Sequence, residues 1–236
     1  MVETRTHRYL VTVADHRRGS LQAHQFRPHG PSRLRREWPP GRRDPPTLAD
    51  YVHNAVNLRA PPQRVNGQRS PMTLLQSGDR APNMILRGTE GRSYSLDEAR
   101  ARGPVLLTFF QLDCQACDIS YLVWDAAHEA FAGDRFQLWA VGLDAEADAA
   151  AFWEKSGVSF PVLFDDGTSA AKFGLVSTPS HVLVNPEGAV HSSFDAFDRV
   201  SWNTMVEAVA EYLGQPPISI APGEAPDFRP GCTLHS

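Results

Sequence analysis

Two cysteines stand between a strand-like segment and a helix-like segment, and this arrangement constrains the fold more than any other feature of the chain. Val105–Phe110 is an apolar run of strand type, and Cys114 and Cys117 follow it as a Cys-Gln-Ala-Cys pair. From Ile119 to Phe131 the apolar residues recur at helical spacing. The pair is therefore expected at a helix N-terminus, where unsatisfied N–H groups and a partial positive charge favour thiolate. Because thiolate is the reactive form of cysteine, this position predicts disulfide chemistry.

The cysteine count and the absence of targeting signals favour an intracellular redox protein. The 236 residues contain three cysteines and no apolar region typical of a secretory signal. Polar residues follow the twin arginine Arg17-Arg18, so export by that route is not expected. No apolar stretch reaches the roughly 18 residues that a transmembrane helix needs. We therefore expect a cytoplasmic protein that has no membrane partner.

The first 70 residues differ in charge from the remainder. They contain 13 Arg, no Lys and five acidic residues, a net charge of +8 in a chain whose total is −4. Three Pro-Pro pairs in this region break regular structure, and only a short strand at Leu10–Val13 and a helix at Leu48–Leu58, capped by Thr47, are predicted. We therefore predict a poorly structured basic N-terminal extension over residues 1–70.

This extension has three interpretations. It is a disordered segment, or it is not translated because synthesis starts at Met72, or it is a basic arm for anionic partners. No nucleic-acid partner is expected, because aromatic and basic residues do not alternate along it.

A regular pattern of elements begins at Leu74. Strands are predicted over 84–86, 105–110, 137–141, 161–164, 181–184 and 189–192, and helices over 114–131, 144–156, 169–173 and 201–213. Alternating strands and helices followed by a hairpin and a last helix predict an α/β fold, with a mixed central sheet and helices on both faces. Residues 215–236 are predicted to form a Pro-rich C-terminal tail.

Residues 78–214 resemble thioredoxin-like redoxins of the TlpA-type and AhpC/TSA kind. The resemblance rests on the turn Gly78–Pro82, the strand that runs into Cys114 and Cys117, the segment Phe160–Leu163, and Thr178-Pro179 before a strand. It implies a thioredoxin-like domain over 74–214. It also implies that Pro179 is a cis-proline facing the cysteine pair and that Thr178 presents its backbone to the substrate.

The favoured function is thiol–disulfide exchange. Cys114 is first in the motif and is expected to be the more exposed and attacking thiol, while Cys117, one turn further along the same helix face, resolves the mixed disulfide. The substrates would be protein or small-molecule disulfides, with an external thiol reductant and no cofactor beyond the dithiol. Asp113 replaces the Trp usual before the first cysteine, and its carboxylate would oppose thiolate formation if poorly solvated.

Three alternatives remain for the cysteine pair. In a thiol peroxidase Cys117 would be peroxidatic, but Cys114 stands where that family has Thr, and Ser177-Thr178-Pro179 stands where an activating Arg is expected. A zinc site would combine the pair with Cys232 and His235. The two thiols could also be buried and structural.

A few further residues carry two interpretations each. Cys232 is either a third redox thiol or a solvated, intermolecularly reactive thiol. His128 and His181 are proton-relay candidates, although packing is the favoured role for both. Trp139, Trp153 and Trp202 are expected to pack in the core.

Overall fold

The computed structural model describes residues 10–15, 20–25, 73–150, 158, 160–220, 223 and 225–234. Its centre is a seven-stranded mixed sheet with the order β10-β9-β5-β6-β7-β3-β4. The strands are β3 Ile85–Gly88, β4 Ser93–Ser95, β5 Val105–Phe110, β6 Gln137–Gly142, β7 Val162–Phe164, β9 Ser180–Val184 and β10 Val190–Asp195. β5, β6 and β7 are parallel to one another, and β9 and β3 run antiparallel beside them.

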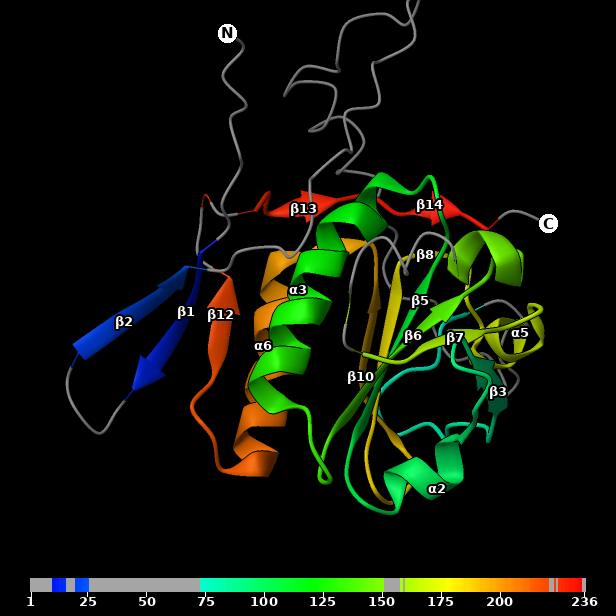
Figure 1. Cartoon of the computed structure of the whole chain (residues 1–236), viewed down its shortest axis with the longest axis horizontal. Helices are drawn as coiled ribbons and strands as arrows, with labels where there is room; N and C mark the ends of the chain where they lie inside the picture. The colour runs from blue at the N-terminus through cyan, green and yellow to red at the C-terminus, as the bar shows by residue number, and fades with distance from the viewer. Residues whose placement is uncertain are drawn as a thin grey trace, which may run out of the picture. The chain divides into compact units, whose positions relative to one another are not determined.

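Helices cover both faces of this sheet, as the sequence predicts (Figure 1). α3 Gln115–Phe131 and α6 Arg199–Leu213 lie on one face, and α2 Leu96–Arg100 and α5 Thr168–Phe173 on the other. Two apolar clusters follow from this layering. One contains Trp124 and Trp202 with the α3 and α6 side, and the other contains Phe109, Trp139 and Phe173 with the α2 and α5 side. Because β5 contributes side chains to both clusters, all six of its residues are buried.

Local sequence signals fix the ends of these elements. Ser95 caps α2 by accepting from the Glu98 backbone N–H, and Asp198 caps α6 by accepting from Ser201 N–H. Gly174 and Gly214 end α5 and α6 in the left-handed region, which glycine adopts without strain. The elements of the central domain therefore lie within a few residues of the predicted ranges.

Short strands lie outside the central sheet. They are β1 Leu10–Asp15, β2 Ser20–Gln25, β8 Ser177–Thr178, β11 Phe197–Asp198, β12 Ile218–Ile220, β13 Phe228–Arg229 and β14 Cys232–Thr233. β1 includes the strand predicted at Leu10–Val13 and pairs antiparallel with β2 and β12. Asn203 of α6 holds β12, because its side chain both donates to and accepts from the Ile220 backbone.

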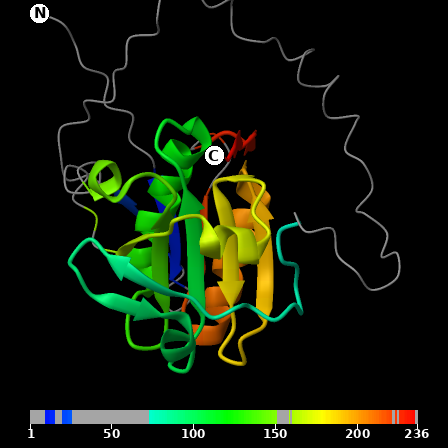
Figure 2. The same cartoon turned by 90° about the vertical axis from the view of Figure 1, so that its right-hand side faces the viewer.

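The C-terminal residues 227–234, hereafter the tail segment, are fastened to the domain. β13 pairs with β11 and β14 pairs with β8, and Arg199 forms an ion pair with Asp227. Figure 1 and Figure 2 both show β14 at the same end of the sheet as the start of α3. The sequence does not predict these strands, since two-residue strands depend on distant partners rather than on local pattern.

Several predictions fall outside the described residues. The helix predicted over 144–156 is seen as helical residues 146–150, and its remainder, with Gly157 and Trp153, cannot be compared. Leu48–Leu58 and Thr47 also lie outside, so the boundary of the basic extension near residue 70 stays a prediction. Within the described residues, no helix combines the length and apolar character needed to cross a membrane.

Candidate active site

The two cysteines of the pair lie at the junction between β5 and α3. Cys114 is the N-cap residue of α3, and its carbonyl accepts the first helical hydrogen bond from Asp118 N–H. Asp113 before it has φ 58, a left-handed conformation that Asp tolerates better than most residues. The loop is held from the side, because Leu112 N–H donates to the Asp144 carboxylate at 2.8 Å.

The prediction that Cys114 is the more exposed thiol is wrong. Cys114 is 1% exposed and Cys117 is 6% exposed. Cys114 is covered because its sulfur faces Thr178 and Cys232 rather than solvent. Cys232 is the least buried of the three cysteines, and all three are free thiols.

Thr178 and Pro179 face the cysteine pair across the end of the sheet. Their peptide bond is cis, as the resemblance implies. The Cys114 thiol donates to the Thr178 carbonyl at 3.3 Å, and the Thr178 hydroxyl donates to the Gln111 side chain at 3.2 Å. The role of Thr178 in substrate binding stays a prediction.

Gln111 is a site residue that the sequence analysis does not single out. Gln111 is 3% exposed and directly follows β5. Its side chain links the segment that leads to Cys114 with Thr178. A polar residue placed immediately after an apolar strand is the only sequence signal for it. Because Gln111 is buried, its amide must be satisfied by neighbours, and Thr178 supplies one of them.

The surroundings shift the pKa values of the two thiols of the pair in opposite directions. The Cys117 thiol, with smaller contributions from the Cys232 thiol, the Cys117 backbone and Thr178, lowers the pKa of Cys114 to about 5 against the effect of burial. Burial raises the pKa of Cys117, and the neighbouring Cys114 sulfur raises it again. The Thr178 carbonyl can accept only from a protonated Cys114 and so opposes its ionisation. The net effect of these groups lowers the pKa of Cys114.

The tail segment brings the third cysteine to the same place. β14 runs antiparallel to β8, with Cys232 opposite Thr178. Burial, together with the hydrogen bond between the Cys232 and Cys114 thiols, raises the pKa of Cys232 to about 11. The sequence analysis treats residues 215–236 as a Pro-rich tail, whereas the structure holds its end against the cysteine pair through two strand pairings.

The histidines do not approach the thiols as relay groups. His181 is 0% exposed and packs against Trp202, Phe194 and Trp124 at ring-centroid separations of 4.3, 4.6 and 5.9 Å. Burial lowers the pKa of His181 to about 3, which keeps the ring neutral at physiological pH. His128 lies half-buried on α3 beside Phe160, and burial lowers its pKa too. Trp139 and Trp202 are core residues.

The zinc alternative gains no support from the arrangement. Across the described ranges, no group of three or more His, Cys, Asp or Glu side chains is set up to hold a metal ion. His235, the fourth predicted ligand, lies outside those ranges.

Two of the proteins to which this chain is similar are named for thiol–disulfide chemistry. A thiol-disulfide oxidoreductase ResA of Bacillus subtilis (strain 168) is 28% identical over 153 residues, covering 64% of this chain and 79% of that protein. A crystal structure from Chlorobium tepidum, named as a thiol:disulfide interchange protein DsbE, superposes with a TM-score of 0.54 at 26% identity, over 59% of this chain and 99% of that one.

A peroxidase relative and the family match complete the comparison. The crystal structure of peroxidoxin BcpB from Mycobacterium tuberculosis superposes with a TM-score of 0.51 at 21% identity, over 59% of this chain and 97% of that one, which shows the fold alone. The AhpC/TSA family matches residues 77–193, which include both cysteines of the pair and Thr178-Pro179. The fold is therefore thioredoxin-like, and residues 77–193 are similar to the AhpC/TSA family.

Proposed function

We propose that this protein is a thiol–disulfide oxidoreductase that works through Cys114 and Cys117. One observation carries the proposal: the two sulfurs interact at the start of α3, and their surroundings lower the pKa of Cys114 while they raise that of Cys117. One thiol is thereby prepared for attack and the other is kept protonated until it is needed. The names of the ResA and DsbE relatives favour the same reaction class.

The exchange proceeds in two balanced steps. The Cys114 thiolate attacks one sulfur of a substrate disulfide, forms a mixed disulfide and expels the other substrate sulfur as a thiolate. Cys117 then loses its proton to the expelled thiolate or to water and attacks the Cys114 sulfur, which releases the second substrate thiol. The substrate disulfide has gained two electrons, and the protein holds a Cys114–Cys117 disulfide. An external thiol reductant returns the pair to the dithiol.

Burial of Cys117 is the reason to prefer exchange over peroxide reduction. A peroxidatic cysteine must be a thiolate that peroxide can reach. Burial raises the pKa of Cys117, so it fails the first condition. If peroxide is reduced at all, we expect Cys114 to be oxidised first.

The test mixes the reduced protein with a small aromatic disulfide and measures how much aromatic thiolate the reaction releases. All variants are made in a Cys232→Ser background, so that only the pair can react. We expect two equivalents of aromatic thiolate from the background chain and one from Cys117→Ala, which stops at the mixed disulfide. Cys114→Ser should release none rapidly. Rapid release from Cys114→Ser, equal to that of the background chain, would overturn the assignment of Cys114.

A further inference from the structure

The three cysteines differ in a way that the two-cysteine reaction leaves unexplained. Cys114, the proposed thiolate, is 1% exposed, so its sulfur offers little surface to an external thiol. Cys232 is the least buried of the three, and its sulfur interacts with Cys114. The reactive thiol is thus enclosed, and an accessible thiol lies against it.

The position of Cys232 is built by several contacts rather than by one. β14 pairs with β8 so that Cys232 stands opposite Thr178, whose carbonyl is 3.3 Å from the Cys114 sulfur. Gly231 allows this approach, because a Cβ there would lie 2.7 Å from the Thr178 carbonyl oxygen. Upstream, the Arg199 backbone N–H donates to the Asp227 carbonyl at 2.9 Å and fixes where the tail segment begins.

We propose that Cys232 is a relay thiol, through which small external thiols reduce the buried Cys114–Cys117 pair. This rests on the proposed function, since it assumes that Cys114 and Cys117 form a redox pair. In the oxidised protein Cys232 loses a proton and attacks the Cys114 sulfur. The Cys114–Cys117 bond breaks, a Cys114–Cys232 disulfide forms, and Cys117 takes up a proton.

The relay presents an accessible sulfur to the reductant. A small thiolate attacks the Cys232 sulfur, forms a mixed disulfide there and expels Cys114 as a thiolate. Low thiol pKa makes a good leaving group, so attack at Cys232 is favoured over attack at Cys114, which would expel the more basic Cys232. A second small thiol then attacks the mixed disulfide and frees Cys232. Two external thiols have become one disulfide, and the protein has regained its dithiol.

The first experiment uses the unaltered chain. The protein is oxidised to the Cys114–Cys117 disulfide, mixed with glutathione for increasing times, quenched in acid with an alkylating reagent and analysed by peptide mass mapping. We expect an early glutathione adduct on Cys232 and a transient Cys114–Cys232 disulfide. An early adduct on Cys114 with none on Cys232 would overturn the relay.

The second experiment compares reduction rates with a matched control. Cys232→Ser should slow glutathione reduction of the oxidised pair by about tenfold or more, because attack at the buried Cys114 sulfur remains the only route. The control carries Cys232→Ser with Thr233→Cys, which moves the thiol one residue along β14 to the opposite side of the strand. It should be as slow as Cys232→Ser alone. An unchanged rate in Cys232→Ser would overturn the relay.

The outcomes separate this inference from the proposed function. If neither the unaltered chain nor Cys232→Ser forms a Cys114–Cys117 disulfide with a small disulfide oxidant, the proposed function fails and takes the relay with it. If both form that disulfide and glutathione reduces both at one rate, the relay alone fails.

Discussion

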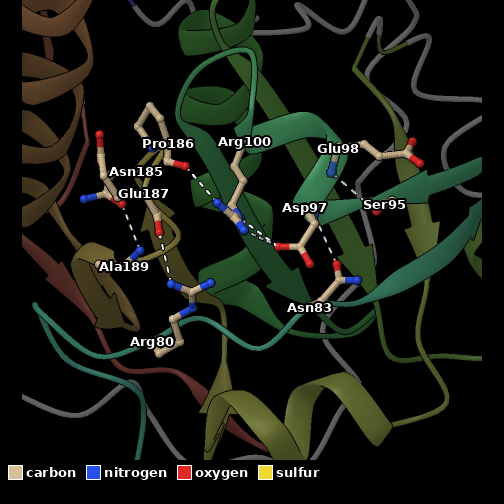
Figure 3. A network of polar contacts seen from close by, with 10 residues as sticks. All are labelled: Arg80, Asn83, Ser95, Asp97, Glu98, Arg100, Asn185, Pro186, Glu187 and Ala189. Carbon is tan, nitrogen blue, oxygen red and sulfur yellow. Dashed lines mark hydrogen bonds and ion pairs between the residues drawn. The ribbon is translucent and has the colours of Figure 1, made fainter.

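The two ends of the central sheet are held together by different kinds of contact. At the amino end of β5, two arginine side chains donate to backbone carbonyls of the turn between β9 and β10. Arg100 of α2 donates to the Pro186 carbonyl at 2.8 Å, and Arg80, in the segment before β3, donates to the Glu187 carbonyl at 3.3 Å (Figure 3). At the carboxyl end, sulfur atoms and one carbonyl bring together Cys114, Thr178 and Cys232. The contacts at the amino end stabilise the fold. Those at the carboxyl end bring together thiols whose pKa values are shifted.

This difference teaches where changes should alter stability and where they should alter reactivity. Polar contacts to backbone carbonyls lower the free energy of the folded state but leave the thiols untouched. Contacts among thiols shift which sulfur is ionised. Each of the following substitutions or titrations therefore tests one end while it monitors the other.

Gly103→Ala should have the largest effect, and it should act on stability alone. A Cβ at Gly103 would lie 1.9 Å from the Arg135 carbonyl oxygen, so the backbone at the amino end must shift. We expect a loss of about 3 kcal/mol in the free energy of unfolding, measured by urea denaturation. The pKa of Cys114 should not change in the folded variant. A variant as stable as the unaltered chain would show that this end is loosely packed.

The pH dependence of Cys114 reactivity should come next in size. Because the pKa of Cys114 is lowered to about 5, the thiolate persists as pH falls from 8 to 6 and is lost only near pH 5. The alkylation rate of Cys114 should follow that profile, whereas in the urea-unfolded chain it should fall about tenfold for each pH unit below the ordinary cysteine value of roughly 8.5. Iodoacetamide labelling with peptide mass mapping measures both. A folded-state profile with its midpoint near 8.5 would contradict the proposed thiolate.

The sequence predicts the amino end of the sheet far better than the carboxyl end. Asn185-Pro186-Glu187-Gly188 has the residues that a tight turn needs, and the structure has a turn there, with Ala189 N–H donating to the Asn185 side chain at 2.8 Å. The apolar run of β5 and the helix after it are likewise local signals. Local composition is sufficient for these elements because the hydrogen bonds that form them lie within one turn or one helix, whereas the contacts of Arg80 and Arg100 with the turn join distant parts of the chain.

The carboxyl end depends on contacts that local composition does not encode. The exposure of Cys114 is predicted wrongly because its cover comes from a tail segment more than a hundred residues away in the chain. Gln111 is overlooked because its partner, Thr178, is reached only once the sheet has formed. The cis peptide bond before Pro179 is anticipated only through the family resemblance, since Thr-Pro alone does not specify it.

Gly231→Ala should have a smaller effect, on reactivity rather than on stability. The new Cβ would meet the Thr178 carbonyl at 2.7 Å and should push β14 away from β8, which uncovers Cys114. We expect alkylation of Cys114 at pH 7 to become about fivefold faster, with less than about 1 kcal/mol lost in the free energy of unfolding, because β14 contributes few ladder hydrogen bonds. Gly133→Ala is the control, since nothing lies within 4 Å of a Cβ there. Equal labelling rates in both variants would show that the tail segment does not cover Cys114.

Arg100→Ala should have the smallest effect of the four and should again act on stability alone. The Arg100 side chain is 19% exposed, pairs with Asp97 at 2.6 Å and reaches the Pro186 carbonyl of a turn far along the chain. We expect a loss of about 1 kcal/mol in the free energy of unfolding.

Arg87→Ala is the matched control, because Arg87 also pairs with a carboxylate, Glu146, at 2.6 Å but is 61% exposed. Its loss should be clearly smaller than that of Arg100→Ala, since solvent screens exposed ion pairs. Equal losses would mean that the contact with Pro186 adds nothing, and any change in the alkylation rate of Cys114 would mean that the two ends of the sheet are coupled.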